Sequence, residues 1–161
     1  MAEPEERVGT TDFESRFEEL FDLAYRVGFR VLGVQDEARD VAQEACARAE
    51  RRWSRLAESP HGWVVRVAAN LAIGVQRKRA RRPPEDATPP ARDVDEFAAE
   101  RVDLVRALGH LPRRQREVVI LRYLADRPEA EVADTLGCSV GTVKTHASRG
   151  LQAMRAELGG E

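Results

Sequence analysis

The sequence predicts an all-α protein made of two small helical domains. Apolar residues recur at steps of three and four over most of the chain, and prolines interrupt this periodicity after residue 82. In addition, 34% of the residues are charged while only 6% are aromatic, which favours helices with thin apolar stripes. We expect domains over residues 11–82 and 93–158, joined by an extended linker over residues 83–92 that leaves the two halves mobile relative to each other.

The first domain should contain three amphipathic helices. They are expected at about residues 13–31, at about residues 36–53, and from residue 60 into the basic run that ends at residue 82. Thr11 and Glu14 have the spacing of a capping box, which predicts the start of the first helix. Ser59 followed by Pro60 predicts the start of the third, because proline favours the first helical position.

The second domain should contain four helices, and its last two form a known motif. The helices are expected at about residues 94–108, 112–124, 128–136 and 139–158. Asp93 and Glu96 offer a capping box for the first of them. Gly137 suits a left-handed C-cap and Ser139 an N-cap, so a short turn should separate the final two helices. A short glycine-containing turn between helices is typical of the helix-turn-helix.

Charge is strongly segregated along the chain, although the net charge is only -2. Residues 1–58 contain 14 acidic and 9 basic residues, whereas residues 59–84 contain 6 basic residues and no acidic one. A concentrated cationic segment attracts phosphates through Coulomb forces and counterion release. The acidic first segment suits a basic protein partner instead.

The last helix should expose a polar face that fits nucleic acid. Its core positions, at helical spacing, are Val143, Ala147, Leu151 and Met154. The residues expected to point outward are Thr142, Lys144, Thr145, Ser148, Arg149 and Gln152, and no acidic residue occurs between positions 139 and 155. A helix of this kind fits the major groove of DNA, with its N-terminal residues at the base edges. The alternative is an ordinary solvated helix face.

The sequence does not predict an enzyme, a cofactor site or a metal site. The histidines His61, His110 and His146 are far apart, and the chain has no HExxH motif, Gly-rich phosphate loop or nucleophile elbow. Cys46 and Cys138 lack the CxxC spacing of zinc sites and are expected to be small, buried or half-buried apolar residues.

A cytoplasmic protein without membrane contact is expected. No apolar run approaches the roughly 20 residues needed to cross a bilayer. The acidic start of the chain also lacks the basic residues that begin a secretory signal.

Two stretches of the second half carry a family resemblance. They are LPRRQREVVILRYL at residues 111–124 and EVADTLGCSVGTVK at residues 131–144. Both resemble region 4 of the bacterial extracytoplasmic-function sigma factors, which are group 4 of the sigma-70 family. In the first half, region 2 of the same family is similar to DVAQEA at residues 40–45, Trp53, and WVVRVAANLA at residues 63–72 with the arginine run that follows. The short connection between Trp53 and Trp63 resembles a short-loop actinobacterial subgroup.

The resemblance implies a subunit that binds core RNA polymerase and directs it to promoter DNA by two contacts. Region 4 would hold the duplex minus-thirty-five element through a recognition face made of Ser139, Gly141, Thr142, Lys144, Thr145, Ser148 and Arg149. Region 2 would hold the separated minus-ten strand through a strand surface made of Arg66, Asn70, Arg77, Lys78, Arg79, Arg81 and Arg82. The family's polymerase-docking segment matches Asp40, Val41, Gln43 and Glu44. An anti-sigma factor is a further candidate partner.

Some of these assignments have structural alternatives. Asn70 has the alternative role of a hydrogen-bonded residue within the helical core. For Trp53 and Trp63, core packing is favoured over base stacking. Asp40 and Glu44, four residues apart, are also compatible with a solvated helix face.

A second class of function fits part of the chain. Residues 141–146 would equally suit the helix-turn-helix of a LuxR-type transcriptional regulator, which binds duplex DNA without core polymerase. That interpretation explains only the last third of the sequence.

Overall fold

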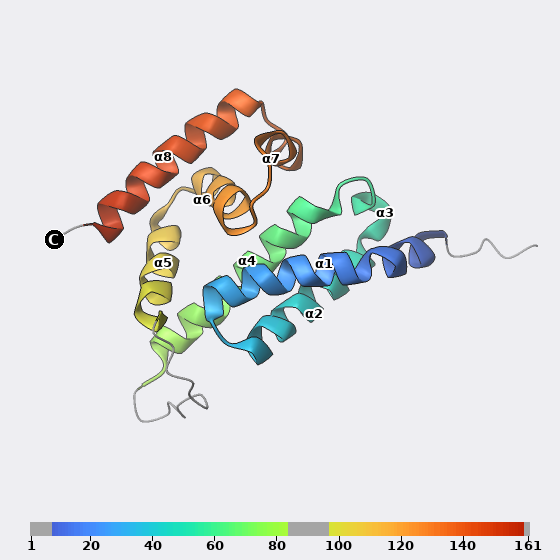
Figure 1. The fold of residues 1–161 in the computed structure, drawn as a ribbon, viewed down its shortest axis with the longest axis horizontal. Coiled ribbons are helices and arrows are strands. Elements are labelled where there is room, and N and C mark those ends of the chain that lie inside the picture. Colours follow the sequence, from blue (N-terminus) through green and yellow to red (C-terminus); the bar gives the residue numbers. More distant parts are fainter. Residues whose placement is uncertain (1–7, 84–96, 160–161) are drawn as a thin grey trace, which may run out of the picture.

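The computed structural model describes residues 8–83 and 97–159, with side chains from Asp12 onward. Within these ranges the chain forms helices and connecting turns and no strand, which confirms the predicted fold class. Figure 1 shows two groups of helices, called here the N-terminal bundle, α1 to α4, and the C-terminal bundle, α5 to α8. None of the described helices is both long and apolar enough to cross a membrane.

The N-terminal bundle packs the three long helices α1, α2 and α4 against one another. Its helices are α1 (Val8–Leu32), α2 (Gln35–Arg51), α3 (Trp53–Leu56) and α4 (Pro60–Arg81). The core is built mainly from alanine, valine and leucine, and its fully buried members include Leu20, Val27, Ala42, Val64 and Ala68. Cys46 is buried in this core, as predicted.

Two element boundaries differ from the prediction. The first helix begins at Val8, so Thr11 lies inside it and the predicted capping box does not form its start. The helix begins before the apolar stripe, which the sequence pattern does not reveal. The second helix ends at Arg51, because Arg52 leaves the helical conformation with φ −117° and ψ 11°, and Trp53 starts the short α3.

The C-terminal bundle holds the predicted helix-turn-helix. Its elements are α5 (Ala98–His110), α6 (Arg113–Val119), η2 (Ile120–Leu124), α7 (Glu129–Leu136) and α8 (Val140–Leu158). The predicted helix over residues 112–124 is therefore two segments, because its last turn is a π-helix. The Ala125 amide donates to the Ile120 carbonyl at 3.1 Å, across five residues. The capping box at Asp93 and Glu96 and nearly all of the predicted linker lie outside the described residues.

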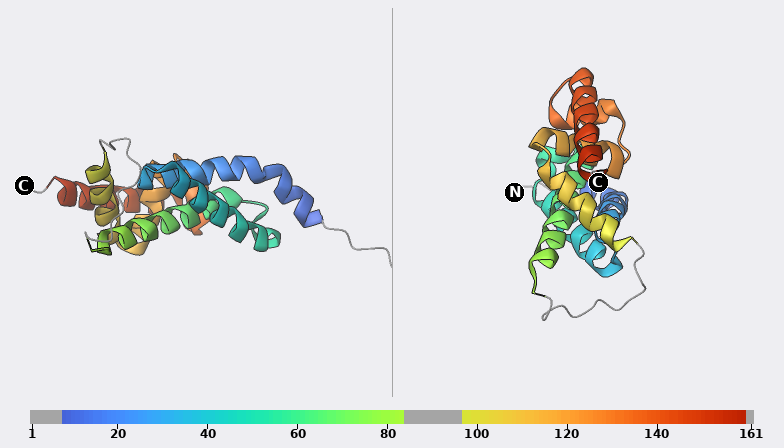
Figure 2. Two further views of the ribbon diagram at one scale, coloured as in Figure 1. Left: turned by 90° about the horizontal axis from the view of Figure 1, so that it is seen from below. Right: turned by 90° about the vertical axis from the view of Figure 1, so that its left-hand side faces the viewer.

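The two bundles are in contact in this structure, and the expected mobility of the two halves stays a prediction. Arg30 of α1 donates to the Leu124 carbonyl and, at 3.2 Å, to Asp126. The guanidinium of Arg101 lies 6.0 Å from the ring centroid of Phe29. Figure 2 shows the C-terminal bundle stacked on one side of the N-terminal bundle, with α8 on the outer side. The amino-acid composition does not predict which polar and cation–π contacts form between the two bundles.

Candidate nucleic-acid interface

The turn before α8 fixes the position of that helix. Gly137 ends α7 in the left-handed conformation, with φ 64° and ψ 41°, which glycine adopts without steric cost. Two residues later, the Ser139 hydroxyl accepts a hydrogen bond from the Thr142 amide at 3.1 Å. Both capping predictions are confirmed, and the first turn of α8 is capped where the recognition face begins.

Packing against α6 decides which face of α8 is exposed. Val143, Ala147, Gly150 and Met154 are buried, whereas Leu151 is only half-buried. Gly150 takes the innermost position because α6 approaches closely: a Cβ at residue 150 would lie 2.8 Å from Val119 Cγ2. The predicted stripe is therefore correct except that Gly150 replaces Leu151.

All the predicted residues of the recognition face are exposed. Within the face, the Thr145 hydroxyl donates to the Gly141 carbonyl at 3.0 Å, and Lys144 Nζ lies 3.8 Å from Glu129 of α7. Ion pairs this exposed are weak and are readily exchanged for a phosphate. The face therefore presents hydroxyl, ammonium and guanidinium donors on one side of a helix, which is the chemistry of groove binding.

The strand surface lies along α4, and the structure divides it into exposed and half-buried residues. Asn70, Arg77, Lys78, Arg81 and Arg82 are exposed. The Asn70 side chain is exposed and makes no hydrogen bond within the described part of the chain, which disfavours the alternative role in the core. The remaining two residues, Arg66 and Arg79, are half-buried.

Both half-buried arginines contact a carboxylate. Arg79 pairs with Glu37 of α2 and donates to Gln76 at 3.0 Å, so it ties α4 to α2. Arg66 Nη2 lies 3.0 Å from Glu117 Oε1, which belongs to α6 of the other bundle. These two cations are therefore engaged within the protein in this structure.

An open groove lies beside the strand surface, and the sequence analysis did not predict it. It is lined by Glu44, Arg48, Arg51, Arg52, Trp63 and Val67. Trp63, Val67 and Asn70 follow one another at helical spacing, so groove and strand surface share one face of α4. Four arginines between positions 48 and 55 were the sequence signal that could have revealed it.

The two tryptophans have different surroundings. Trp53 is 4% exposed, donates from Nε1 to Asp12 at 3.1 Å, and meets the Phe13 ring edge to face at 5.2 Å between centroids. It is a core residue, as favoured above. Trp63 is half-buried and borders the groove.

The predicted polymerase-docking residues are not all available at the surface. Asp40 and Gln43 are exposed, and Glu44 is half-buried beside Arg48, which donates to it at 2.6 Å. That hydrogen bond holds the pKa of Glu44 below its usual range. The expectation that Val41 lies at the docking surface does not match this structure, in which Val41 is 4% exposed because it packs into the core under Gly28.

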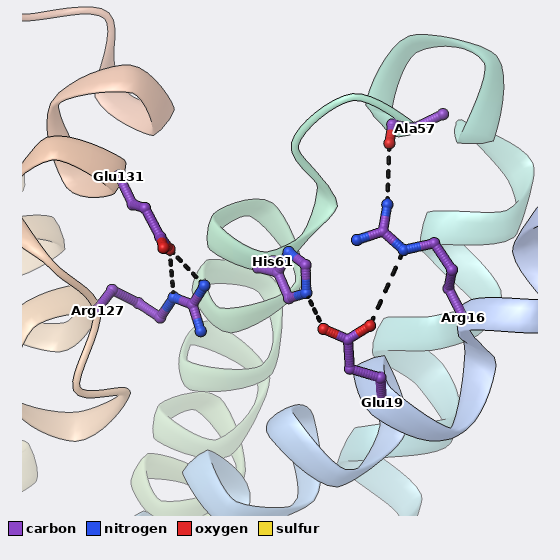
Figure 3. A network of polar contacts seen from close by, with 6 residues as sticks. All are labelled: Arg16, Glu19, Ala57, His61, Arg127 and Glu131. Carbon is purple, nitrogen blue, oxygen red and sulfur yellow. Dashed lines mark hydrogen bonds and ion pairs between the residues drawn. The ribbon is translucent and has the colours of Figure 1, made fainter.

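A polar network fastens the start of α4 to α1 (Figure 3). Glu19 accepts from His61 and lies 4.0 Å from Arg16, which in turn donates to the Ala57 carbonyl at 3.1 Å. The hydrogen bond from His61 holds the pKa of Glu19 below its usual range, with a smaller contribution from the charge of Arg16. On the side of the C-terminal bundle, Arg127 pairs with Glu131 at 2.8 Å.

Comparisons with known proteins identify relatives of both bundles. The family model "Sigma-70 region 2" matches residues 16–82, and "Sigma-70, region 4" matches residues 101–154. The RNA polymerase sigma factor SigV of Bacillus subtilis is 32% identical over 139 residues, which cover 83% of this chain and 83% of that protein. The ECF RNA polymerase sigma factor SigE of Mycolicibacterium smegmatis is 30% identical over 150 residues, which cover 85% of this chain and 58% of that longer protein.

A solved structure has the same fold. The sigma factor RpoE of Bartonella quintana, determined in complex with the anti-sigma factor NepR, is 22% identical with a TM-score of 0.54, covering 94% of this chain and 99% of that one. The matches extend over both bundles, so they favour the two-domain interpretation and not the LuxR-type alternative, which accounts for the last third alone.

Proposed function

Because the chain belongs to the sigma-70 family of RNA polymerase sigma factors, in its extracytoplasmic-function group, we propose that it binds core RNA polymerase and contacts promoter DNA at two places. The recognition face of α8 reads the duplex minus-thirty-five element. The strand surface of α4 holds the separated minus-ten strand. The observation that carries the proposal is the capped α8, whose exposed donors face outward with no carboxylate among them.

The chemistry of α4 supports a single-strand contact. Single strands are held by cations that follow the backbone and by aromatic rings beside them. Lys78, Arg81 and Arg82 supply exposed cations at the end of α4, and Asn70 supplies an exposed amide. We propose that Arg51 and Arg52 extend this surface across the groove beside Trp63.

Docking on polymerase is assigned to α2. Asp40, Gln43 and Glu44 are the residues of the matching segment that reach the surface, and they form an acidic and polar patch. A basic helical partner on the polymerase fits such a patch by charge.

The proposed role needs no catalytic group, cofactor or metal in this chain, and it belongs in the cytoplasm, where promoter DNA is found. An anti-sigma factor, as found with the Bartonella protein, is proposed as a further partner.

Transcription in vitro tests the proposal. Purified chain is mixed with core RNA polymerase at low salt and given genomic fragments, and discrete promoter starts are expected. Replacing Lys144 and Arg149 together with alanine should reduce those starts by about tenfold or more, because each base or phosphate contact is worth about 1–3 kcal/mol. Arg155→Ala, also a basic residue exposed on α8, is the matched control and should leave them unchanged.

Two outcomes would overturn the proposal. One is the absence of a complex with core polymerase at low salt. The other is duplex-specific binding that neither needs polymerase nor leads to initiation, which is the behaviour of a LuxR-type regulator.

A further inference from the structure

A small cavity lies between α1 and the turn that leads from η2 to α7. Its volume is about 220 Å³, the share of the liquid that about seven water molecules occupy. One wall comes from residues 23–30 of α1 and the other from residues 124–127, so each bundle supplies one side. None of the lining residues belongs to the recognition face, the strand surface or the polymerase-docking segment. The function proposed above therefore leaves this cavity without a role.

Part of the cavity wall is apolar. Leu23 and Val27 lie one turn apart on α1, and both are buried. On the other wall, Ala125 is buried and Leu124 is half-buried. Aliphatic side chains from both bundles therefore provide a surface that suits the apolar part of a ligand.

Three arginines accompany this apolar surface. Arg26 and Arg30 are exposed and stand four residues apart, so they lie on the same face of α1. Arg127 is half-buried and belongs to the opposite wall. Asp126 is the one carboxylate among the lining residues. Three positive charges against one negative charge leave the lining with a formal charge of +2.

Arg26 has donors to spare for a ligand. A guanidinium carries five N–H donors. Arg26 uses its Nε for the Asp22 carbonyl, at a long 3.4 Å, and makes no ion pair within the described residues. Both of its Nη groups are therefore available to an anion.

The other two arginines already hold carboxylates, which shows the kind of group that this site binds. Arg30 Nη1 lies 3.2 Å from Asp126, and Arg127 directs both Nε and Nη2 at a single oxygen of Glu131 (Figure 3). Each guanidinium keeps further N–H donors that are not committed to these partners. An oxyanion in the cavity can thus be bound without breaking either ion pair.

We propose that the cavity binds a small organic dianion, of the chemical class of a phosphate monoester with a short apolar group. The three arginines hold the oxyanion, and the aliphatic side chains pack against the apolar group. A guanidinium matches the oxygens of a phosphate with two parallel hydrogen bonds. A phosphate monoester carries a charge of about −1.5 to −2 at pH 7, which balances the charge of the lining. This binding site goes beyond the proposed function, since no DNA or polymerase contact uses it.

Asp126 provides a test in the opposite direction from the arginines. Its exposed carboxylate competes with an incoming anion for the guanidinium of Arg30. Asp126 has φ 51°, a left-handed conformation that asparagine also adopts readily. Asp126→Asn therefore removes the competing charge without straining the turn, and a gain in binding cannot arise from loss of folding.

Calorimetric titration of the full chain with phenyl phosphate tests the site, at constant ionic strength so that screening stays the same. Arg26→Ala should weaken binding by about fivefold or more, and Asp126→Asn should tighten it by about threefold to tenfold, because one charge a few ångströms away is worth about a factor of five even in water. Arg39→Ala is the matched control, because Arg39 is an exposed arginine of α2 outside the cavity. It should bind like the parent. Inorganic phosphate should bind more weakly than phenyl phosphate, since it lacks an apolar part.

Chemical-shift mapping on the 15N-labelled chain locates the bound phenyl phosphate. The largest changes are expected in residues 23–30 and 124–127, on both walls of the cavity. Shift changes confined to the strand surface would overturn the proposal, and so would equal affinities of Arg26→Ala and Arg39→Ala or an Asp126→Asn variant that binds no better than the parent. Promoter-specific initiation is not a readout here, so failure of this site leaves the proposed function untouched.

Discussion

Gly150 of α8 packs directly on Val119 of α6, and this contact sets the distance between the two helices. A methyl group at position 150 would lie 2.8 Å from Val119 Cγ2 and 3.5 Å from the Gln115 carbonyl oxygen. Neither neighbour is the far end of a flexible chain. The two helices must therefore separate if residue 150 gains a side chain.

Gly150→Ala should destabilise the C-terminal bundle by about 1–3 kcal/mol, the usual cost of overpacking a well-filled core. Denaturant unfolding followed by circular dichroism measures it. Gly141→Ala on the same helix is the control, because the nearest atom to its added Cβ is Ser139 Oγ at 3.8 Å. Equal unfolding midpoints for Gly150→Ala and the parent would contradict the prediction.

Removing the exposed cations at the end of α4 should lower the salt dependence of single-strand binding. The triple variant Lys78→Ala, Arg81→Ala and Arg82→Ala should reduce the slope of log affinity against log salt by up to about 2, since each lost phosphate contact on a single strand contributes about 0.7. Titrations between low and physiological salt give this slope.

The control for that variant removes three exposed cations elsewhere. Arg26→Ala, Arg39→Ala and Arg106→Ala together change the net charge equally but lie outside the strand surface. A slope that falls as far in this control would mean that overall charge, and not the end of α4, determines the salt dependence.

Cys46 should resist alkylation in the folded protein. Burial raises the pKa of the Cys46 thiol to about 11, and only the thiolate reacts. In a Cys138→Ser background, iodoacetamide at pH 8 should label position 46 only when denaturant unfolds the N-terminal bundle. Mass spectrometry follows the reaction, and rapid labelling without denaturant would contradict the buried position.

Glu19 should contribute to acid sensitivity of the N-terminal bundle. The hydrogen bond from His61 lowers the pKa of Glu19 in the folded protein. The ionised carboxylate therefore stabilises the fold above the unfolded-state pKa of about 4.3, and this stabilisation is lost as the pH falls through the lower folded-state pKa. The melting temperature of Glu19→Gln should therefore fall less between about pH 5 and about pH 3 than that of the parent.

Glu18→Gln is the matched control for the acid experiment. Glu18 is the neighbouring exposed carboxylate on α1 and makes no ion pair within the described residues. Its variant should keep the parent's pH profile. Identical profiles for all three proteins would show that the His61 contact does not contribute to stability.

Local signals predicted the helix-turn-helix well, because both of its caps are properties of single residues. Gly137 adopts the left-handed conformation and Ser139 caps α8, as their residue types favour. Cys138, which was expected to be buried or half-buried because it lacks the spacing of a metal site, is half-buried. The exposed side of α8 then followed from helical spacing.

Tertiary contacts explain what the sequence did not reveal. Val41 belongs to both an apolar stripe and a family motif, and the packing under Gly28 decides that it is buried. The sequence shows Glu117 only as the neighbour of several arginines, and the fold brings it to Arg66, 51 residues away. The π-helix after Val119 has no local signature in residue type either.

That π-helix has a geometrical consequence for promoter reading. A helical turn with one residue more than usual advances every later position by about 100° around the axis. Residues 120–124 therefore act as a spacer whose length sets the angle between α6 and the segment that leads into α7. Loss of one residue there would leave each side chain of α8 chemically unchanged while turning its donors away from the direction in which they point in this structure.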